Sequence, residues 1–357
     1  MNPVPLLKSF VFRWPWFTAV LMGFFTGLSA AAFAGENPFH VMKIMVMAAA
    51  GTPYDLGMTL VYTTPLIFSG LSVAVAYRAG LFNIGAEGQL VLGGMAATIV
   101  ALQIGGRFPE FSSSSSFGAM AIGMMVCGLA AALIGGLVGL MTGYLRARRG
   151  SHEVVTSIML NFLAIALTSW LVLEKFHSVD TQNPETRPVG TAFKSIAFGG
   201  FDGAPVTIWF VSGIFSAVIV AIVFDQTLLG FRLRATGENS EAATFSGIDT
   251  GRQIMIAMAL SGALAGLSGL GDVLGGAGRY RIGFSSDYGF TGIAVALLAG
   301  GRPLAVIASA FLFGALHKGA LDLDFETDHV TRDLAMIIQG CVILFASARW
   351  FHRNKSS

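Results

Sequence analysis

The amino-acid sequence predicts an all-α fold, a polytopic bundle of about eight to ten transmembrane helices with at least one broken helix. Charged residues make up only 12% of the 357 residues, about half the share found in soluble domains. The mean hydropathy is +0.70, and apolar runs near the ~20 residues that cross a bilayer recur along the chain. A membrane β-barrel would show short alternating segments instead. We therefore treat residues 1–357 as one membrane domain.

Ten apolar runs are candidate spans because of their length. The eighth is shorter and is expected to cross as a partial helix, which leaves the count at eight to ten. The first run is long for a signal-peptide core and more spans follow it, so we expect an uncleaved helix. In chain order the runs are Phe17–Ala34, Thr59–Tyr77, Glu87–Ile104, Phe117–Gly143, Val155–Leu173, Val206–Phe224, Ile254–Leu274, Tyr288–Ala299, Pro303–Lys318 and Leu334–Ser347.

The distribution of basic residues predicts the orientation of the bundle. If all ten runs cross and the N-terminus is cytoplasmic, 13 of the 22 Lys and Arg residues lie inside and nine outside. This excess follows the positive-inside rule, and the basic cluster over 146–149 is its strongest anchor. Both termini are then cytoplasmic. The same count places residues 225–253 in an inner loop and residues 176–205 in an outer loop.

Spaced glycines predict close helix contacts inside the bundle. They occur as Gly135-x-x-x-Gly139 and Gly262-x-x-x-Gly266, a spacing that lets helix backbones approach each other in a membrane. By contrast, the segment 35–57 is partly polar and is not counted as a span.

The sequence contains no constellation for catalysis or metal binding. No Lys follows a Gly, so the phosphate-binding loop of an ATPase is absent. His152 and Glu153 begin a zinc-protease motif, but its second His is missing. Cys127 and Cys341 lie far apart within apolar runs and are expected to be free. A net charge of +2 gives no sign of a nucleic-acid partner. We expect no catalytic residue, no metal and no cofactor bound by this chain.

The most informative segment is 78–90, which joins two spans without a hydrophilic loop. Its glycines permit a helix break, which membrane proteins tolerate where it lines a cavity or packs in protein. Asn83, Glu87 and Gln89 lie at or near membrane depth there. Asn83 and Glu87 would share a helix face. An intramembrane carboxylate indicates a translocation pathway, but Glu87 pairing with Arg78 or capping the broken helix explains it equally well.

The inner loop 225–253 has the pattern of a docking element. A basic strand, a turn at Gly237 and a short helix from Ser240 to Ile248 are expected, with Asn239 or Ser240 as N-cap and a stop at Gly247. An ordinary solvated loop is the alternative.

The glycine-rich segment 275–292 is expected on the outer side. Its aromatic and hydroxyl groups suit a sugar or a base, although Tyr280 and Tyr288 fit an interfacial aromatic belt slightly better. We include Asp272 and Phe290 among the candidate pathway residues. An ion pair between Asp272 and Arg279 is the structural alternative for this carboxylate.

Four segments of the chain resemble the motifs of one known family in their order and spacing. They are 78–89, 153–161, 234–248 and 292–298. They are similar to the permease subunits of bacterial ABC importers for nucleosides and simple sugars, within the branched-chain amino acid and ribose permease superfamily. The resemblance extends from about Asn37 to Phe345. His152 and the turn 300–303 depart from the usual family pattern.

The resemblance implies a division of labour among subunits in the bacterial inner membrane. It implies a single permease domain over 1–357, a separate cytoplasmic ATP-binding subunit that uses the ATP, a second related permease and an extracytoplasmic binding protein or lipoprotein. The inner loop would hold the coupling helix, and the residues expected to dock the ATPase are Arg234, Gly237, Glu238, Asn239, Glu241, Ala242, Ala243 and Gly247. A secondary transporter driven by an ion gradient remains the alternative, because it also uses broken helices and intramembrane acids.

Overall fold

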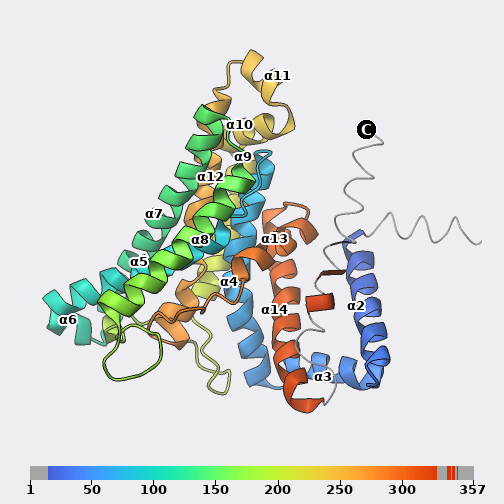
Figure 1. Ribbon diagram of the computed structural model, residues 1–357, viewed down its shortest axis with the longest axis vertical. Coiled ribbons are helices and arrows are strands. Elements are labelled where there is room, and N and C mark those ends of the chain that lie inside the picture. Colours follow the sequence, from blue (N-terminus) through green and yellow to red (C-terminus); the bar gives the residue numbers. More distant parts are fainter. Residues whose placement is uncertain (1–14, 328–335, 339, 342–343, 345–357) are drawn as a thin grey trace, which may run out of the picture.

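The computed structural model describes residues 15–327, 336–338, 340–341 and 344, with side chains from Val20 onward. Its regular structure is helical (Figure 1). The α-helices are α2 (Pro15–Phe33), α3 (Pro38–Ala50), α4 (Pro53–Arg78), α5 (Ala86–Arg107), α6 (Pro109–Ser113), α7 (Phe117–Arg149), α8 (Glu153–Leu171), α9 (Ile208–Gln226), α10 (Leu228–Glu238), α11 (Ser240–Phe245), α12 (Thr250–Leu267), α13 (Tyr288–Leu298) and α14 (Pro303–Glu326).

Seven helices in the described part of the chain are long and apolar enough to cross a membrane, which confirms the polytopic helical bundle. They are α4, α5, α7, α8, α9, α12 and α14, with α8 and α12 extended by π-helical turns at Val172–Phe176 and Gly271–Gly276. The eighth predicted run is the short helix α13, as expected. The tenth, Leu334–Ser347, lies mostly outside the described residues.

Helix α3 was not predicted, because residues 35–57 were interpreted as a partly polar connection. Its start carries a recognisable signal. The Asn37 side-chain oxygen accepts a hydrogen bond from the Phe39 amide at 2.9 Å, and Pro38 occupies the first helical position. Asn as N-cap followed by Pro is a favoured way to begin a helix. In Figure 1, α3 lies across the base of α4 and α14, between α2 and the rest of the bundle.

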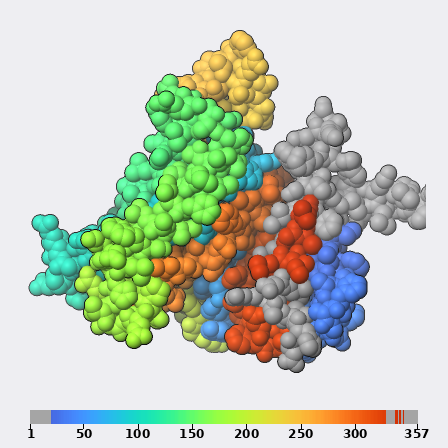
Figure 2. Space-filling view, viewed as in Figure 1, coloured from blue at the N-terminus to red at the C-terminus, as the bar shows by residue number. Residues whose placement is uncertain are grey.

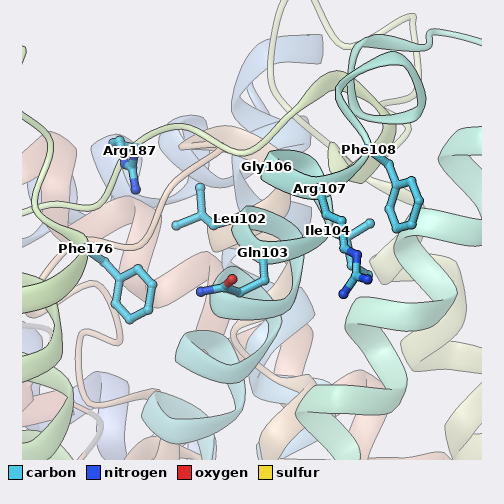
Figure 3. A pocket seen from close by; sticks show the side chains of 8 residues that line it. All are labelled: Leu102, Gln103, Ile104, Gly106, Arg107, Phe108, Phe176 and Arg187. Carbon is cyan, nitrogen blue, oxygen red and sulfur yellow. The ribbon is translucent and has the colours of Figure 1, made fainter.

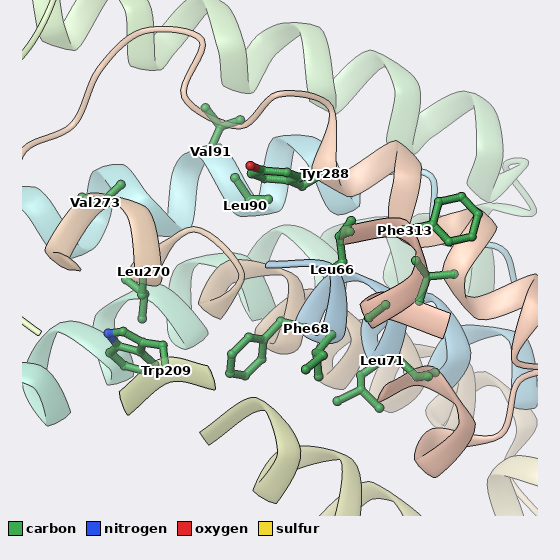
Figure 4. Packing of buried hydrophobic residues seen from close by; sticks show 14 of the residues in the cluster. Leu66, Phe68, Leu71, Leu90, Val91, Trp209, Leu270, Val273, Tyr288 and Phe313 are labelled. Carbon is green, nitrogen blue, oxygen red and sulfur yellow. The ribbon is translucent and has the colours of Figure 1, made fainter. Parts of the chain in front are cut away.

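Helix α4 forms the centre of the bundle. It contacts α9, α12, α13 and α14, and 78% of its most apolar window is buried, compared with 22% in α8 and in α9. Figure 4 shows Leu66, Phe68 and Leu71 of α4 packed among the labelled side chains of the core. Because neighbouring protein surrounds α4 on most sides, it is the span best placed to carry buried polar groups.

The predicted glycine contacts form the seam between α7 and α12. A Cβ atom on Gly135 would overlap the backbone of Gly262, and one on Gly139 would overlap the Met258 carbonyl oxygen. Gly266 meets the backbone of Ala131 in the same way. The spacing therefore permits backbone-to-backbone packing, as predicted from small residues four apart.

The two ends of the bundle are formed by different elements. Figure 1 shows α10 and α11 at one end, together with the end of α7 that carries Arg146, Arg148 and Arg149. The opposite end holds α6 and the irregular chain after α8. In Figure 2, α11 projects from the surface as a separate knob at its end of the molecule.

Candidate translocation and coupling sites

The predicted break between α4 and α5 is present. Helix α4 ends at Arg78, the chain reverses at Gly80 with φ of +73°, and α5 begins at Ala86. A positive φ favours glycine because other residues meet a Cβ clash there. Residues 81–85 return into the protein without helical structure. We call this stretch the re-entrant loop.

A buried polar network fixes the re-entrant loop to three helices. The Asn83 amide nitrogen lies 2.8 Å from the Gln89 side-chain oxygen, 2.8 Å from the Ser261 hydroxyl and 3.2 Å from the Ser72 hydroxyl. All four side chains are fully buried. Asn83 and Glu87 do not share a helix face, because Asn83 precedes the first turn of α5. Access to Asn83 and Gln89 from the pathway stays a prediction.

Asn161 of α8 clamps the same loop from the other side, a role that sequence reasoning missed. Its side-chain oxygen accepts from the Gly88 amide at 2.9 Å, and its side-chain nitrogen donates to the Ile84 carbonyl at 2.9 Å. An amide within an otherwise apolar span was the signal, since buried polar groups need partners.

Glu87 lies where the N-terminal ends of α5 and α13 meet. Its carboxylate accepts a hydrogen bond from the Gly289 amide at 2.7 Å, and the Ser285 side chain bonds to the same carboxyl group. Partial positive charge at helix N-termini stabilises such a carboxylate, which is only 2% exposed. Glu87 therefore caps α13. Pairing with Arg78 was the wrong alternative, because the Arg78 Nε atom donates to the Gly301 carbonyl at 2.9 Å.

The segment 277–287 precedes α13 as extended and turning chain. Arg279 pairs with Glu185 at 2.7 Å, so the alternative in which Arg279 pairs with Asp272 is wrong. Tyr280 is 1% and Tyr288 5% exposed. Both rings are interior groups of this chain, which corrects their assignment to an aromatic belt. The outer loop supplies the partner backbone, since the Thr186 amide donates to the Tyr280 carbonyl at 2.9 Å.

A cavity of about 260 Å³ lies between α5, α8 and the segment 280–287, and we call it the inner cavity. Glu87 and Asp287 contribute carboxylates to its lining. Tyr280 and Phe284 contribute an aromatic pair, with ring centroids 4.9 Å apart and planes at 68°. The remaining lining groups include the hydroxyls of Thr168, Ser169, Ser285 and Ser286. This lining can accept and donate hydrogen bonds and can contact an aromatic ring.

The other two predicted pathway residues lie outside the inner cavity lining. Asp272 is in the π-helical turn that ends α12, and Arg281 is the charge that acts on it. Such turns are frequent at functional sites. Phe290 is 42% exposed on α13. A pathway role for either residue stays a prediction.

A larger cavity of about 820 Å³ opens at the far end of α5 (Figure 3). Gln103 and Arg107 of α5 line it together with Phe176 and Arg187 from the chain after α8. The predicted topology places this outer cavity on the extracytoplasmic side. These residues carry no shared sequence signal, because their grouping depends on how α5 meets the outer loop.

Lys318 is a further residue that sequence reasoning missed. It was placed at the end of a predicted span, yet its side chain is only 8% exposed. Its ammonium group lies 3.2 Å from an oxygen of Asp55 and 2.6 Å from an oxygen of Asp322. This triad joins the first turn of α4 to the second half of α14.

At the opposite end, the predicted short helix is present as α11. The Asn239 side-chain oxygen accepts from the amides of Glu241 and Ala242 at 3.1 and 2.9 Å, so Asn239 is the N-cap. Gly247 follows the helix with φ of +81°. Ala243 faces the protein, whereas Glu241 and Ala242 are exposed.

The basic stretch before α11 is a helix and not the expected strand. Helix α10 begins after Thr227, whose hydroxyl accepts from the Gly230 amide at 3.1 Å. The chain turns at Asn239, because Gly237 belongs to the last turn of α10. Arg234 bonds to the Phe224 carbonyl and lies 3.6 Å from Asp225, which ties α10 to α9.

Gly237 connects the two regions. A Cβ atom there would lie 2.5 Å from the Arg78 carbonyl oxygen and 2.7 Å from the Gly80 nitrogen. The backbone of α10 therefore rests directly on the turn that begins the re-entrant loop. This contact lies at the start of the loop that leads to Asn83 and Glu87.

Comparison with known proteins defines the class. The family model described as branched-chain amino acid transport system / permease component matches residues 56–347. The chain belongs to this permease family.

Individual relatives cover nearly the whole chain. It is 31% identical to the nucleoside ABC transporter permease protein NupB of Lactococcus lactis, over 93% of this chain and 90% of that protein. It is 31% identical to the guanosine ABC transporter permease protein NupP of Bacillus subtilis, over 93% and 92%. A glucose ABC transporter permease protein of Haloferax volcanii is 30% identical, over 94% and 87%. The two bacteria each hold a second relative, at 27% and 26% identity.

Proposed function

We propose that this permease imports nucleosides across the bacterial inner membrane, with both termini in the cytoplasm. ATP is hydrolysed by a separate cytoplasmic subunit, so this chain itself binds no cofactor. A second related permease completes the pore, as the paired relatives in two bacteria support. An extracytoplasmic binding protein or lipoprotein delivers the substrate.

The observation that supports docking of the ATPase subunit is the exposed face of α11. This helix projects from the bundle (Figure 2), and its Phe245 side chain is 86% exposed beside exposed Glu238 and Glu241. An apolar anchor ringed by charges at a membrane protein's cytoplasmic end fits a groove in a soluble partner. Ala243 packs inward, which keeps α11 attached to α12 while the outer face is free to dock.

The test compares two phenylalanines that are equally exposed at opposite ends of the protein. Phe245→Asp should abolish co-purification of the ATPase subunit and ATP-dependent guanosine uptake. Phe325→Asp, at a residue 89% exposed at the end of α14, is the matched control and should retain both. Equal co-purification with both variants would refute docking on α11.

Uptake energetics separate this proposal from its alternatives. Vanadate should stop guanosine uptake, whereas a protonophore should not while ATP is supplied. The opposite pattern would identify the secondary transporter driven by an ion gradient. Glucose is the second candidate substrate, because of the Haloferax relative, and competition between glucose and guanosine decides between them.

A further inference from the structure

The inner cavity carries charge of one sign. Among the described residues that line it, Glu87 and Asp287 are the two carboxylic acids, and none is Lys or Arg. Arg281 lies between two lining residues, Tyr280 and Ile282, but it is not part of the lining and acts on Asp272 instead. Arg281 is outside the lining because successive side chains of extended chain point to opposite sides.

Both carboxylates keep acceptor capacity toward the cavity. A carboxylate offers about four lone-pair sites, and Glu87 uses part of this capacity on Gly289 and Ser285. Asp287 occupies the N-cap position of α13, yet its side chain makes no capping hydrogen bond. Glu87 caps this helix end in its place, which leaves the Asp287 carboxylate available at the cavity rim.

From these observations we propose that the inner cavity binds one uncharged nucleoside and rejects its phosphorylated form. Glu87 and Asp287 accept hydrogen bonds from the ribose hydroxyls, and the base lies against Phe284, whose ring is held by Tyr280. The volume of about 260 Å³ is slightly below the range of about 300–1,000 Å³ that is usual for small-molecule sites, so the inner cavity has room for at most one small molecule. This inference rests on the proposed nucleoside import and adds the residues that select the substrate.

The chemistry predicts two kinds of discrimination. A phosphate would bring negative charge toward two carboxylates with no cation in the lining, which should weaken binding roughly a hundredfold. An analogue without the 2′ and 3′ hydroxyls of the ribose would leave the carboxylates without these two donors. Loss of hydrogen bonds to charged groups should weaken its binding at least about tenfold.

The experiment measures competition against labelled guanosine uptake in proteoliposomes containing the complete transporter. The competitors are guanosine, 2′,3′-dideoxyguanosine and guanosine monophosphate. Asp287→Asn and Glu87→Gln remove one charge each and keep the side-chain shape. Asp202→Asn is the matched control, because Asp202 is another non-glycine residue with positive φ, 46° against 58° for Asp287, and it lies in the outer loop.

We expect the preference for guanosine over both analogues to fall at least about fivefold in Asp287→Asn or Glu87→Gln, and to be unchanged in Asp202→Asn. The binding protein is identical in every sample, so a changed ratio reports on the permease. Asn tolerates positive φ, which favours folding of Asp287→Asn, and Glu87→Gln keeps an acceptor for Gly289.

Unchanged preferences in both variants, with normal uptake in the wild type, would overturn this inference and leave the proposed function standing. If the wild-type transporter took up no nucleoside with ATP, the proposed function would fail and this inference with it.

Discussion

The contact between α10 and the re-entrant loop leads to the sharpest prediction, through the variant Gly237→Ala. The added Cβ would lie 2.5 Å from the Arg78 carbonyl oxygen, whereas ordinary Cβ contacts begin at 3.4 Å. The two backbones must therefore separate by about 0.9 Å. Such overpacking costs about 1–3 kcal/mol, and the better helix propensity of Ala offsets about 1 kcal/mol of it. The protein should still fold, since domains have about 5–15 kcal/mol of stability.

The added Cβ raises the free energy only of those conformations in which α10 contacts the turn at Gly80. A bias of about 1–3 kcal/mol shifts an equilibrium between two conformations by roughly 5–150-fold. We therefore expect Gly237→Ala to reach the membrane and bind the ATPase subunit normally, while guanosine uptake falls about tenfold.

The assay measures guanosine uptake per ATP hydrolysed in proteoliposomes, with Gly251→Ala as control. A Cβ on Gly251, in the first turn of α12, would meet its nearest neighbour at 3.5 Å, an ordinary contact at the same end of the protein. If Gly237→Ala transported as much guanosine per ATP hydrolysed as the wild type and Gly251→Ala, movement would not be transmitted through this contact.

Two further predictions concern stability in detergent. Asn161→Leu leaves the Gly88 amide without a partner in the interior and should lower the free energy of unfolding by about 1–3 kcal/mol. The control, Met159→Leu on the exposed face of α8, should leave the free energy of unfolding unchanged. Equal melting temperatures of the two variants would contradict the role of Asn161 as a clamp. Lys318→Met leaves the partly exposed carboxylates of Asp55 and Asp322 without their cation and should lower the free energy of unfolding by about 1.5–3 kcal/mol. The control is Lys43→Met at an exposed position of α3. A loss no larger than that of the control would show that the triad contributes nothing to stability.

Patterns within one segment were sufficient to predict the long spans, the close glycine contacts and the short helix α11, but they missed helices α3 and α10. Apolar length identified the long spans because a bilayer imposes one length on every crossing helix. Gly135 and Gly139 identified a close contact because spacing along a helix determines which residues share a face. Asn239 and Ser240 marked the start of α11 because a cap bonds to amides two and three residues away, and the structure shows that Asn239 makes these bonds. None of these predictions required knowledge of a distant residue.

Partners brought from distant parts of the chain required the tertiary structure. Glu87 was recognised as a buried acid, but its partner Gly289 lies about 200 positions away, and Arg78 was equally plausible from sequence alone. Likewise, Gly237 was interpreted as a turn until packing placed it against Gly80. The sequence by itself determined a membrane bundle with a broken helix, because hydropathy and local hydrogen bonding act over short distances. Only the fold decided which helix ends meet at Glu87 and what lines the inner cavity, because those contacts depend on how whole helices pack.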